Sequence, residues 1–207
     1  MTTPRDLLIT VMDEVPGDPA ERGEVSLGLA GAELIDLLVA GAVTLGGDEG
    51  DRIVPDGPTD TRDRMLDQAM ASFVAEAPYE SVGDWLWRRG RDLAPAYLAA
   101  LEAEGHVTRQ HRSWTFRPGR PVLVDSHDHR LAGDRRRSNE PVLAALVTAV
   151  GIRDEEDEEN GGDAPGVDDD AVDTVLAAVN NAVVELEALR QRRAIEQSAF
   201  DNIWRGE

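Results

Sequence analysis

The run AELIDLLVAG, residues 32–41, constrains the fold more than any other part of this chain. Only two of its residues are charged, Glu33 and Asp36. Its large apolar residues recur at helical spacing, and they are Leu34, Ile35, Leu37 and Leu38. A helix with so little polar surface must be covered by other elements over most of its circumference. The sequence therefore predicts a buried helix, ending near Gly41, with the rest of the chain packed around it.

Composition favours a helical core. Aromatic residues make up only 4% of the chain, whereas hydrophobic residues reach an ordinary 41%. The core must then consist mostly of Leu, Val and Ala, which favours helices over a β-sandwich. A chain of 207 residues is long enough to bury a real core. We expect a mainly α fold, a single globular domain over residues 1–207, with amphipathic helices around the buried helix and short β-hairpins.

The remaining elements follow from periodicity and turn residues. We expect further helices at about residues 62–75, 81–89, 92–104, 140–150 and 170–193. Strands are expected at 6–13 and 24–27, and in two hairpins that pair 42–46 with 52–55 and 107–108 with 114–116. Residues 121–124 follow as an extended piece. We expect a polar loop at 126–138, an acidic flexible loop at 154–169 and a C-terminal tail at 194–207.

Charge is unevenly distributed along the chain. The net charge is −20, from 41 acidic and 21 basic residues, and every base is an arginine. This excludes a generally basic nucleic-acid coat and a chain drawn wholesale to anionic membranes. Residues 154–173 carry eleven acids and no base, whereas residues 86–137 carry eleven arginines and six acids. A local basic face on an acidic protein would be a selective anion site. Alternatively, these arginines only solvate a region rich in loops.

Signals of catalysis are weak. The chain has no cysteine, and His127 and His129 are two residues apart with no third ligand at the usual spacing, so we expect no metal site. No nucleophile elbow, P-loop or dinucleotide fingerprint is present. The Gly28-x-x-Gly31 pair is typical of close helix packing rather than of a phosphate cradle. We expect a protein that is not an enzyme and needs no cofactor.

The longest apolar stretch, residues 142–152, is shorter than a membrane span, and the N-terminal apolar run is too short for a signal peptide. We expect a cytoplasmic protein. A helix at 92–104 followed by a hairpin is also the pattern of a winged-helix nucleic-acid binder. Its presumed recognition helix carries three acids and no base, however, and a groove helix needs donors for phosphates and base edges.

Three segments together resemble the Golgi phosphoprotein 3 family, in its short bacterial form. They are LLITVMDE with GEVSLGLAGAELIDLLVAGAVTL, then DGPTDTRDRMLDQAM, then YLAALEAEGHV with the hairpin after it. The resemblance covers about residues 5–151, with a weaker match at 170–189. It implies a mostly α-helical domain without enzymatic activity. It also implies an adaptor that binds phosphatidylinositol 4-phosphate at a membrane.

The family's headgroup pocket uses a Trp, an Arg inside the Gly-Leu-x-Gly turn, and two Arg three residues apart at a helix start. In this sequence these positions are Glu21, Ala30, Arg91 and Ala94, in that order. Only Arg91 keeps the family's residue. Other arginines lie nearby, so the candidate headgroup-binding residues are Arg91, Arg88, Arg89 and Arg22. Each lost charge-assisted contact is worth about 1.5 to 3 kcal/mol, so tight headgroup binding in the family's mode should be abolished.

The family's hairpin, which serves self-association and membrane contact, falls near residues 114–124. The residues that would suit an anionic membrane interface there are Trp114, Phe116, Arg117, Arg120, Val122 and Leu123. Alternatively, Trp114 and Phe116 pack inward. We expect a weak partner in the form of an anionic phospholipid surface at the inner face of the membrane, an unidentified protein partner, and a homo-oligomer through the hairpin. The alternatives are a winged-helix-like nucleic-acid binder and a pure protein-interaction scaffold.

Overall fold

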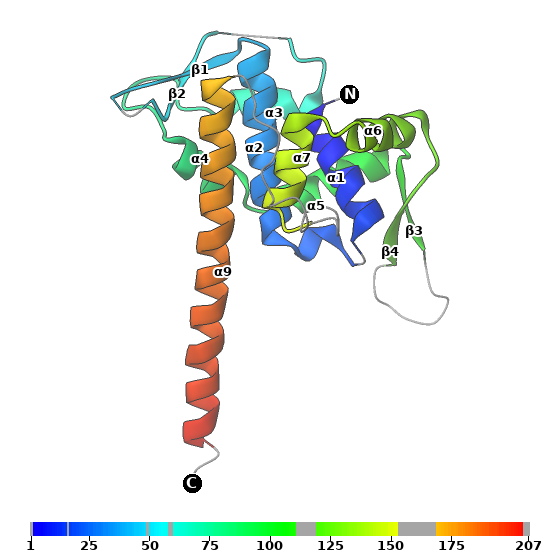
Figure 1. Cartoon of the computed structure of the whole chain (residues 1–207), viewed down its shortest axis with the longest axis vertical. Coiled ribbons are helices and arrows are strands. Elements are labelled where there is room, and N and C mark those ends of the chain that lie inside the picture. The colour runs from blue at the N-terminus through cyan, green and yellow to red at the C-terminus, as the bar shows by residue number, and fades with distance from the viewer. Residues whose placement is uncertain are drawn as a thin grey trace.

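The structure is a computed structural model of the chain and describes residues 2–15, 17–48, 50–57, 60–110, 119–152 and 169–204. Helices dominate it, as predicted, and the strands form two small antiparallel sheets (Figure 1). In the first half of the chain the elements are α1 (Thr3–Glu14), the short 3-10 helix η1 (Pro19–Glu21), α2 (Gly23–Val39), β1 (Val43–Gly46), β2 (Arg52–Pro55), α3 (Arg64–Ala71) and α4 (Val82–Arg89). In the second half they are α5 (Leu93–Ala103), β3 (Val107–Gln110), β4 (Arg120–Leu123), α6 (His127–Arg137), α7 (Pro141–Ala149) and α9 (Asp170–Trp204).

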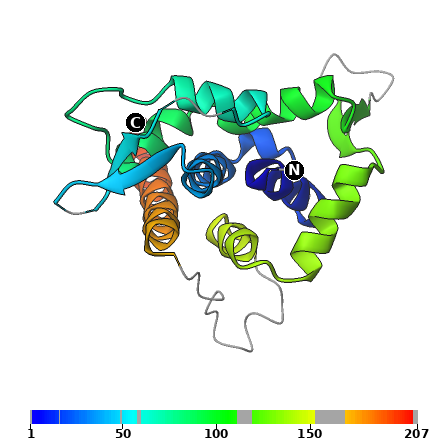
Figure 2. The same ribbon diagram turned by 90° about the horizontal axis from the view of Figure 1, so that it is seen from above.

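Helix α2 is the centre of the fold, as its sequence predicted. Figure 2 shows it surrounded by α1, α7 and α9, with α3, α4 and α5 along its remaining side. Leu34, Ile35 and Leu37 are buried, whereas Leu38 near the helix end is only partly buried. The buried side chains of the surrounding helices are mainly Leu, Val and Ala, in agreement with the composition.

Two glycines let neighbouring elements approach α2 closely. A Cβ atom at Gly28 would lie 2.5 Å from Cγ1 of Val150, and one at Gly31 would lie 2.3 Å from Cγ2 of Val179. Both distances are far inside van der Waals contact, so neither position accepts a side chain without movement. The interpretation of this glycine pair as a packing feature is confirmed.

The strands predicted at residues 6–13 and 24–27 are wrong, because both segments are helical. Residues 6–13 belong to α1, and residues 24–27 are the first turns of α2. Helix α1 is buried along most of its length, so its sequence has no polar face to reveal the helical period. The hydroxyl of Thr10 donates to the Asp6 carbonyl at 2.8 Å, which satisfies this polar group inside the helix. Packing thus overrides the strand preference of its β-branched residues.

The polar loop predicted at residues 126–138 is also wrong, because helix α6 occupies it. Ser126 caps the helix, and its Oγ accepts from the His129 N–H at 3.1 Å. The only described residue of α6 that is fully buried is Ala132. Polar contacts attach α6 to α1 instead, among them the Arg136–Glu14 ion pair at 2.8 Å and the His129–Asp13 side-chain contact at 2.7 Å. An ion-paired helix has no apolar stripe, so periodicity could not predict it.

The second hairpin and the last helix also differ from expectation. Strand β3 pairs with β4, from Val107 opposite Leu123 to Gln110 opposite Arg120. The predicted partner strand, 114–116, lies outside the described residues, as does nearly all of the predicted acidic loop. Helix α9 extends to residue 204 where a tail was expected from 194. Its cap is Asp169, whose Oδ1 accepts from the N–H of Ala171 and Val172.

The close contact at Gly31 predicts a large effect of one methyl group. We expect Gly31→Ala to destabilise the protein by about 1 to 3 kcal/mol, because α2 and α9 must separate to accommodate the new Cβ. Adding Val179→Ala should cost less than the sum of the two single changes, since it removes the clashing methyl groups. Denaturant melts of the two single variants and the double variant measure this coupling.

Gly83→Ala is the matched control, because a Cβ there meets only the Ser81 hydroxyl at 3.9 Å. Gly83 lies on an open face of α4, so replacing it by alanine should leave the free energy of unfolding unchanged or raise it by up to about 1 kcal/mol. Equal losses from Gly31→Ala and Gly83→Ala would contradict the packing argument.

Candidate functional site

Most arginines of the predicted basic face are engaged in ion pairs. The structure describes nine of the eleven arginines in residues 86–137. Seven of them contact carboxylates, in the pairs Arg88–Glu80, Arg89–Glu33, Arg109–Glu102, Arg130–Asp125, Arg135–Asp6, Arg136–Glu14 and Arg137–Asp134. The other two, Arg91 and Arg120, are exposed and form no ion pair with a described residue. Most of the positive charge of this window is therefore balanced by carboxylates, although the pairs of Arg130 and Arg137 lie on the surface.

Arg89 is a structural residue. Its guanidinium donates two hydrogen bonds of 2.8 Å to the carboxylate of Glu33, which is 0% exposed in the middle of α2. The Tyr97 hydroxyl of α5 donates to the same carboxylate at 3.0 Å. Burial raises the pKa of Glu33, and the Arg89 guanidinium opposes that rise. Burial and the neighbouring Glu33 carboxylate raise the pKa of Tyr97 well above its usual value. Because the Arg89 guanidinium is paired with Glu33, it is not available to bind an external phosphate.

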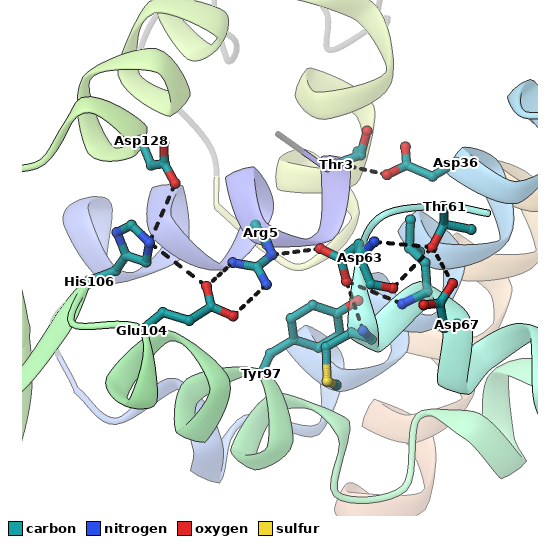
Figure 3. A network of polar contacts seen from close by, with 12 residues as sticks. Thr3, Arg5, Asp36, Thr61, Asp63, Asp67, Tyr97, Glu104, His106 and Asp128 are labelled. Carbon is teal, nitrogen blue, oxygen red and sulfur yellow. Dashed lines mark hydrogen bonds and ion pairs between the residues drawn. The ribbon is translucent and has the colours of Figure 1, made fainter.

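A second polar network ties the start of α1 to three other helices (Figure 3). Arg5 contacts Asp63, the N-cap of α3, at 2.8 Å, and donates to both carboxylate oxygens of Glu104 at the end of α5. The Arg5 guanidinium holds the pKa of Glu104 below its usual range. His106 lies 3.5 Å from Asp128 in α6 and 3.8 Å from Glu104. These contacts join elements far apart in the sequence, which assigns Arg5 a structural role.

Two other candidate headgroup residues, Arg88 and Arg22, lie in different surroundings from Arg91. Arg88 donates to both oxygens of Glu80 at 2.6 and 2.7 Å, and its guanidinium lies 5.2 Å from the ring centre of Trp85. Arg22 contacts Glu24 at 3.0 Å and the Val150 carbonyl at 3.3 Å. Neither of them lines the pocket that contains Arg91. The structure therefore does not bring the four predicted residues together in one site.

Arg91 lines an open pocket of about 420 Å³. Its walls come from η1, the start of α2, the α4–α5 junction and α9, and they include Glu21, Trp87, Arg91, Asp92, Leu186 and Arg190. Two acids and two arginines line it, and Arg190 also pairs with Glu24 at 2.8 Å. The charge of the lining is thus balanced rather than positive. No sequence pattern points to Trp87, Leu186 or Arg190 as neighbours, because they come from elements that only the fold brings together.

The four positions equivalent to the family's headgroup contacts divide into two pairs. Glu21 and Arg91 face the same pocket, as headgroup positions should. Ala30 and Ala94 are each 0% exposed and lie outside the pocket lining. The Ala30 carbonyl accepts from the Trp85 indole N–H at 3.1 Å, and the Ala94 N–H donates to the Ser26 hydroxyl at 3.1 Å. Of the two positions that face the pocket, only Arg91 carries a side chain that could bind a phosphate.

The predicted membrane hairpin is only partly described. Trp114, Phe116 and Arg117 lie outside the described residues. Arg120 is exposed at the start of β4, whereas Val122 is half-buried and Leu123 packs against the core. The membrane role of this hairpin stays a prediction.

The nucleic-acid alternative gains no support from the helices. The exposed positions of α5 include Ala96, Ala99 and Ala103, which offer no hydrogen-bond donor to a groove. Among the described residues, no three histidine or carboxylate side chains are grouped as metal ligands. Within the same part of the chain, no helix is both long enough and apolar enough to cross a bilayer.

The architecture is that of a mainly α protein built around one buried helix, with an open pocket of balanced charge at the α4–α5 junction. The family model of Golgi phosphoprotein 3 (GPP34) matches residues 4–197. This match spans most of the chain, so the chain belongs to the Golgi phosphoprotein 3 family, as its sequence motifs indicated. A search of the curated proteins found no match.

The Glu33–Arg89 pair predicts which arginine matters for stability. We expect Arg89→Ala to destabilise the protein by about 3 to 5 kcal/mol, because it leaves a buried carboxylate without its partner. Arg91→Ala should change stability by no more than about 0.5 kcal/mol, since Arg91 is exposed. Urea melts compare the two variants. Arg89→Lys, which keeps the charge but not the two-point contact, should fall between them. A larger loss from Arg91→Ala would contradict the assignment.

The surroundings of Asp36 predict how the stability of the protein depends on pH. It accepts from the Thr3 N–H at 2.8 Å, and burial raises its pKa above the usual 3.8. The folded protein therefore binds this proton more readily than the unfolded chain, so the carboxylate lowers stability as pH rises through its folded pKa. Asp36→Asn keeps an acceptor and removes the buried charge, so it should stabilise the protein at pH 7. Urea melts should show that gain shrinking to zero as pH falls towards 3.8. A loss of stability at pH 7 would mean that the charge at the α1 N-terminus outweighs burial.

Proposed function

We propose that this protein is a non-enzymatic adaptor that associates weakly and without headgroup selectivity with anionic lipid surfaces on the cytoplasmic side of a membrane. The observation that carries the proposal is the composition of the Arg91 pocket. Two of the four positions equivalent to the family's headgroup contacts line it, Glu21 and Arg91, and only Arg91 keeps the family's residue. Membership of the Golgi phosphoprotein 3 family supports an adaptor role.

The charges of the pocket support weak binding. Glu21 and Asp92 would repel a phosphate that Arg91 attracts. Arg190 is shared with Glu24, so the described residues of the pocket lining offer Arg91 no second free cation for a two-point contact. Selective recognition of a phosphorylated inositol would need several such contacts, each worth about 1.5 to 3 kcal/mol. One exposed arginine near a membrane contributes about 1 kcal/mol, and salt screens it.

The polar side chains support a non-catalytic role. The buried carboxylates Asp6, Glu33 and Asp63 each contact an arginine, and none of the three lines the Arg91 pocket. A catalytic acid or base must instead be free to reach a bound substrate. The alternative function is a pure protein-interaction scaffold, which the same experiment separates from lipid binding.

Vesicle sedimentation tests the proposal. The protein should pellet weakly with vesicles that contain phosphatidylglycerol, and equally with vesicles of the same charge that contain phosphatidylinositol 4-phosphate. It should not pellet with neutral phosphatidylcholine vesicles. Binding should be largely lost between about 0.05 M and about 0.3 M salt, because screening weakens contacts between exposed charges.

Charge-reversal variants test which residues carry the binding to vesicles. Arg91→Glu combined with Arg120→Glu should abolish it, whereas Arg64→Glu, an exposed arginine on α3, should have a smaller effect. Salt-resistant, selective binding of phosphatidylinositol 4-phosphate would show that the pocket recognises a headgroup after all. No binding to any vesicle would exclude the lipid role and favour the scaffold.

A further inference from the structure

Charged side chains of both signs line the Arg91 pocket without pairing with one another. Glu21, Arg91 and Asp92 all contribute to its lining, and all three are exposed. No ion pair joins any of them to a described residue, whereas seven of the nine described arginines in residues 86–137 are paired. Because the fold leaves these three charges uncompensated, the pocket can attract an anion and a cation together.

The groups that suit an anion lie at the start of α2. Gly23 and Ser26 of its first turn line the pocket together with Arg91. No described side chain caps this helix, so the N–H groups of its first turn and the positive end of its dipole are left for an anion. Ser26 is 6% exposed, and its hydroxyl accepts from the Ala94 N–H at 3.1 Å but donates to no described residue. A buried hydroxyl proton, an uncapped helix start and an arginine are all donors to a phosphate.

The groups that suit a cation come from η1 and from the start of α5. Glu21 is the last residue of η1. Asp92 is the N-cap residue of α5, but its side chain makes no capping hydrogen bond. Both carboxylates can therefore accept hydrogen bonds from an ammonium group. The indole ring of Trp87 lines the same pocket, and aromatic rings attract ammonium groups as well.

We propose that the Arg91 pocket binds a zwitterion in which a short linker joins a phosphate to a primary ammonium, as in a phosphoethanolamine group. The phosphate contacts Arg91, the Ser26 hydroxyl and the start of α2. The ammonium contacts Glu21 and Asp92. Such a group belongs either to a lipid headgroup or to a soluble molecule, and a pocket of about 420 Å³ has room for it in both forms.

The two unpaired acids make the primary ammonium part of the recognition. Its three N–H donors can reach both carboxylates, whereas a trimethylated ammonium has no N–H to donate. A phosphate without an ammonium leaves Glu21 and Asp92 facing its negative charge. Phosphatidylglycerol presents such a phosphate, so the pocket gives it no preference. The inference deepens the proposed function, because it rests on the same pocket and names the ligand class that this pocket selects.

NMR titration of the full chain with soluble ligands tests the proposal without a membrane, so its outcome does not depend on vesicle binding. The indole N–H signal of Trp87 reports binding in the pocket. Glycerophosphoethanolamine should bind with a dissociation constant on the order of 1 mM. Glycerophosphocholine and glycerophosphate should bind at least about 10-fold more weakly, because each lacks the charge-assisted hydrogen bonds to the acids. Equal binding of the three ligands would overturn the proposal.

Variants of the pocket test the two sides separately. Glu21→Gln combined with Asp92→Asn should weaken glycerophosphoethanolamine by about 10-fold and strengthen glycerophosphate, because the acids then neither attract the ammonium nor repel the phosphate. Asparagine tolerates the left-handed backbone of residue 92, so the fold is kept. Arg91→Gln should weaken both ligands, whereas Glu76→Gln, an exposed acid outside the pocket lining, should change neither. A double variant that binds both ligands like the natural chain would contradict the assignment.

Vesicle sedimentation distinguishes the two sources of the group. Pelleting with vesicles of phosphatidylcholine and phosphatidylethanolamine, but not with phosphatidylcholine alone, would assign the ligand to a lipid headgroup. Binding of glycerophosphoethanolamine without such pelleting would assign it to a soluble molecule. No binding of glycerophosphoethanolamine at about 10 mM would overturn the proposal, whatever the result with anionic vesicles.

Discussion

The Glu33 carboxylate lies in the middle of the most buried helix, and the surrounding structure is arranged to satisfy it. Arg89 of α4 and Tyr97 of α5 both donate to it, and Arg89 also donates to the Met65 carbonyl in α3. One carboxylate thereby fixes three helices against α2. An unpaired charge at this depth would be prohibitive, so α4 and α5 can pack only where their donors reach it. Their junction is where the Arg91 pocket lies.

Ion pairing is the general use of arginine in this protein. The basic window looks like an anion-binding face in the sequence, but the fold directs seven of its nine described arginines to carboxylates. Some of these contacts replace an apolar interface, as between α6 and α1, where Arg135 and Arg136 meet Asp6 and Glu14. Arg89, Arg135 and Arg136 thus hold helices together, whereas Arg130 and Arg137 form local pairs on the surface. Arg91 and Arg120 are the two described arginines of this window without an ion pair to a described residue.

The Arg91 pocket differs in chemistry from the headgroup site that the family resemblance implies. Two of the family's four contact positions still face it, but one of them now carries an acid, Glu21. The other two positions hold small residues, Ala30 and Ala94, that pack in the core. Recognition of a specific headgroup depends on several donors converging on one phosphate, so the loss of three contacts affects selectivity first.

The sequence by itself determined the elements that have one apolar face or a strong local signal. These include α2, α4 with its Ser81 cap, α5, α7 and the first hairpin, as well as the family and the retained position of Arg91. Only the tertiary structure decided that residues 6–13 and 127–137 are helices, because one is buried on most sides and the other is held by charges. It also decided which acid each arginine meets and that Trp87 and Arg190 join the pocket. The spacing of apolar residues along a segment indicates a helix or strand with one buried face. It does not show which residues distant in the sequence will contact that segment, because those contacts leave no local pattern.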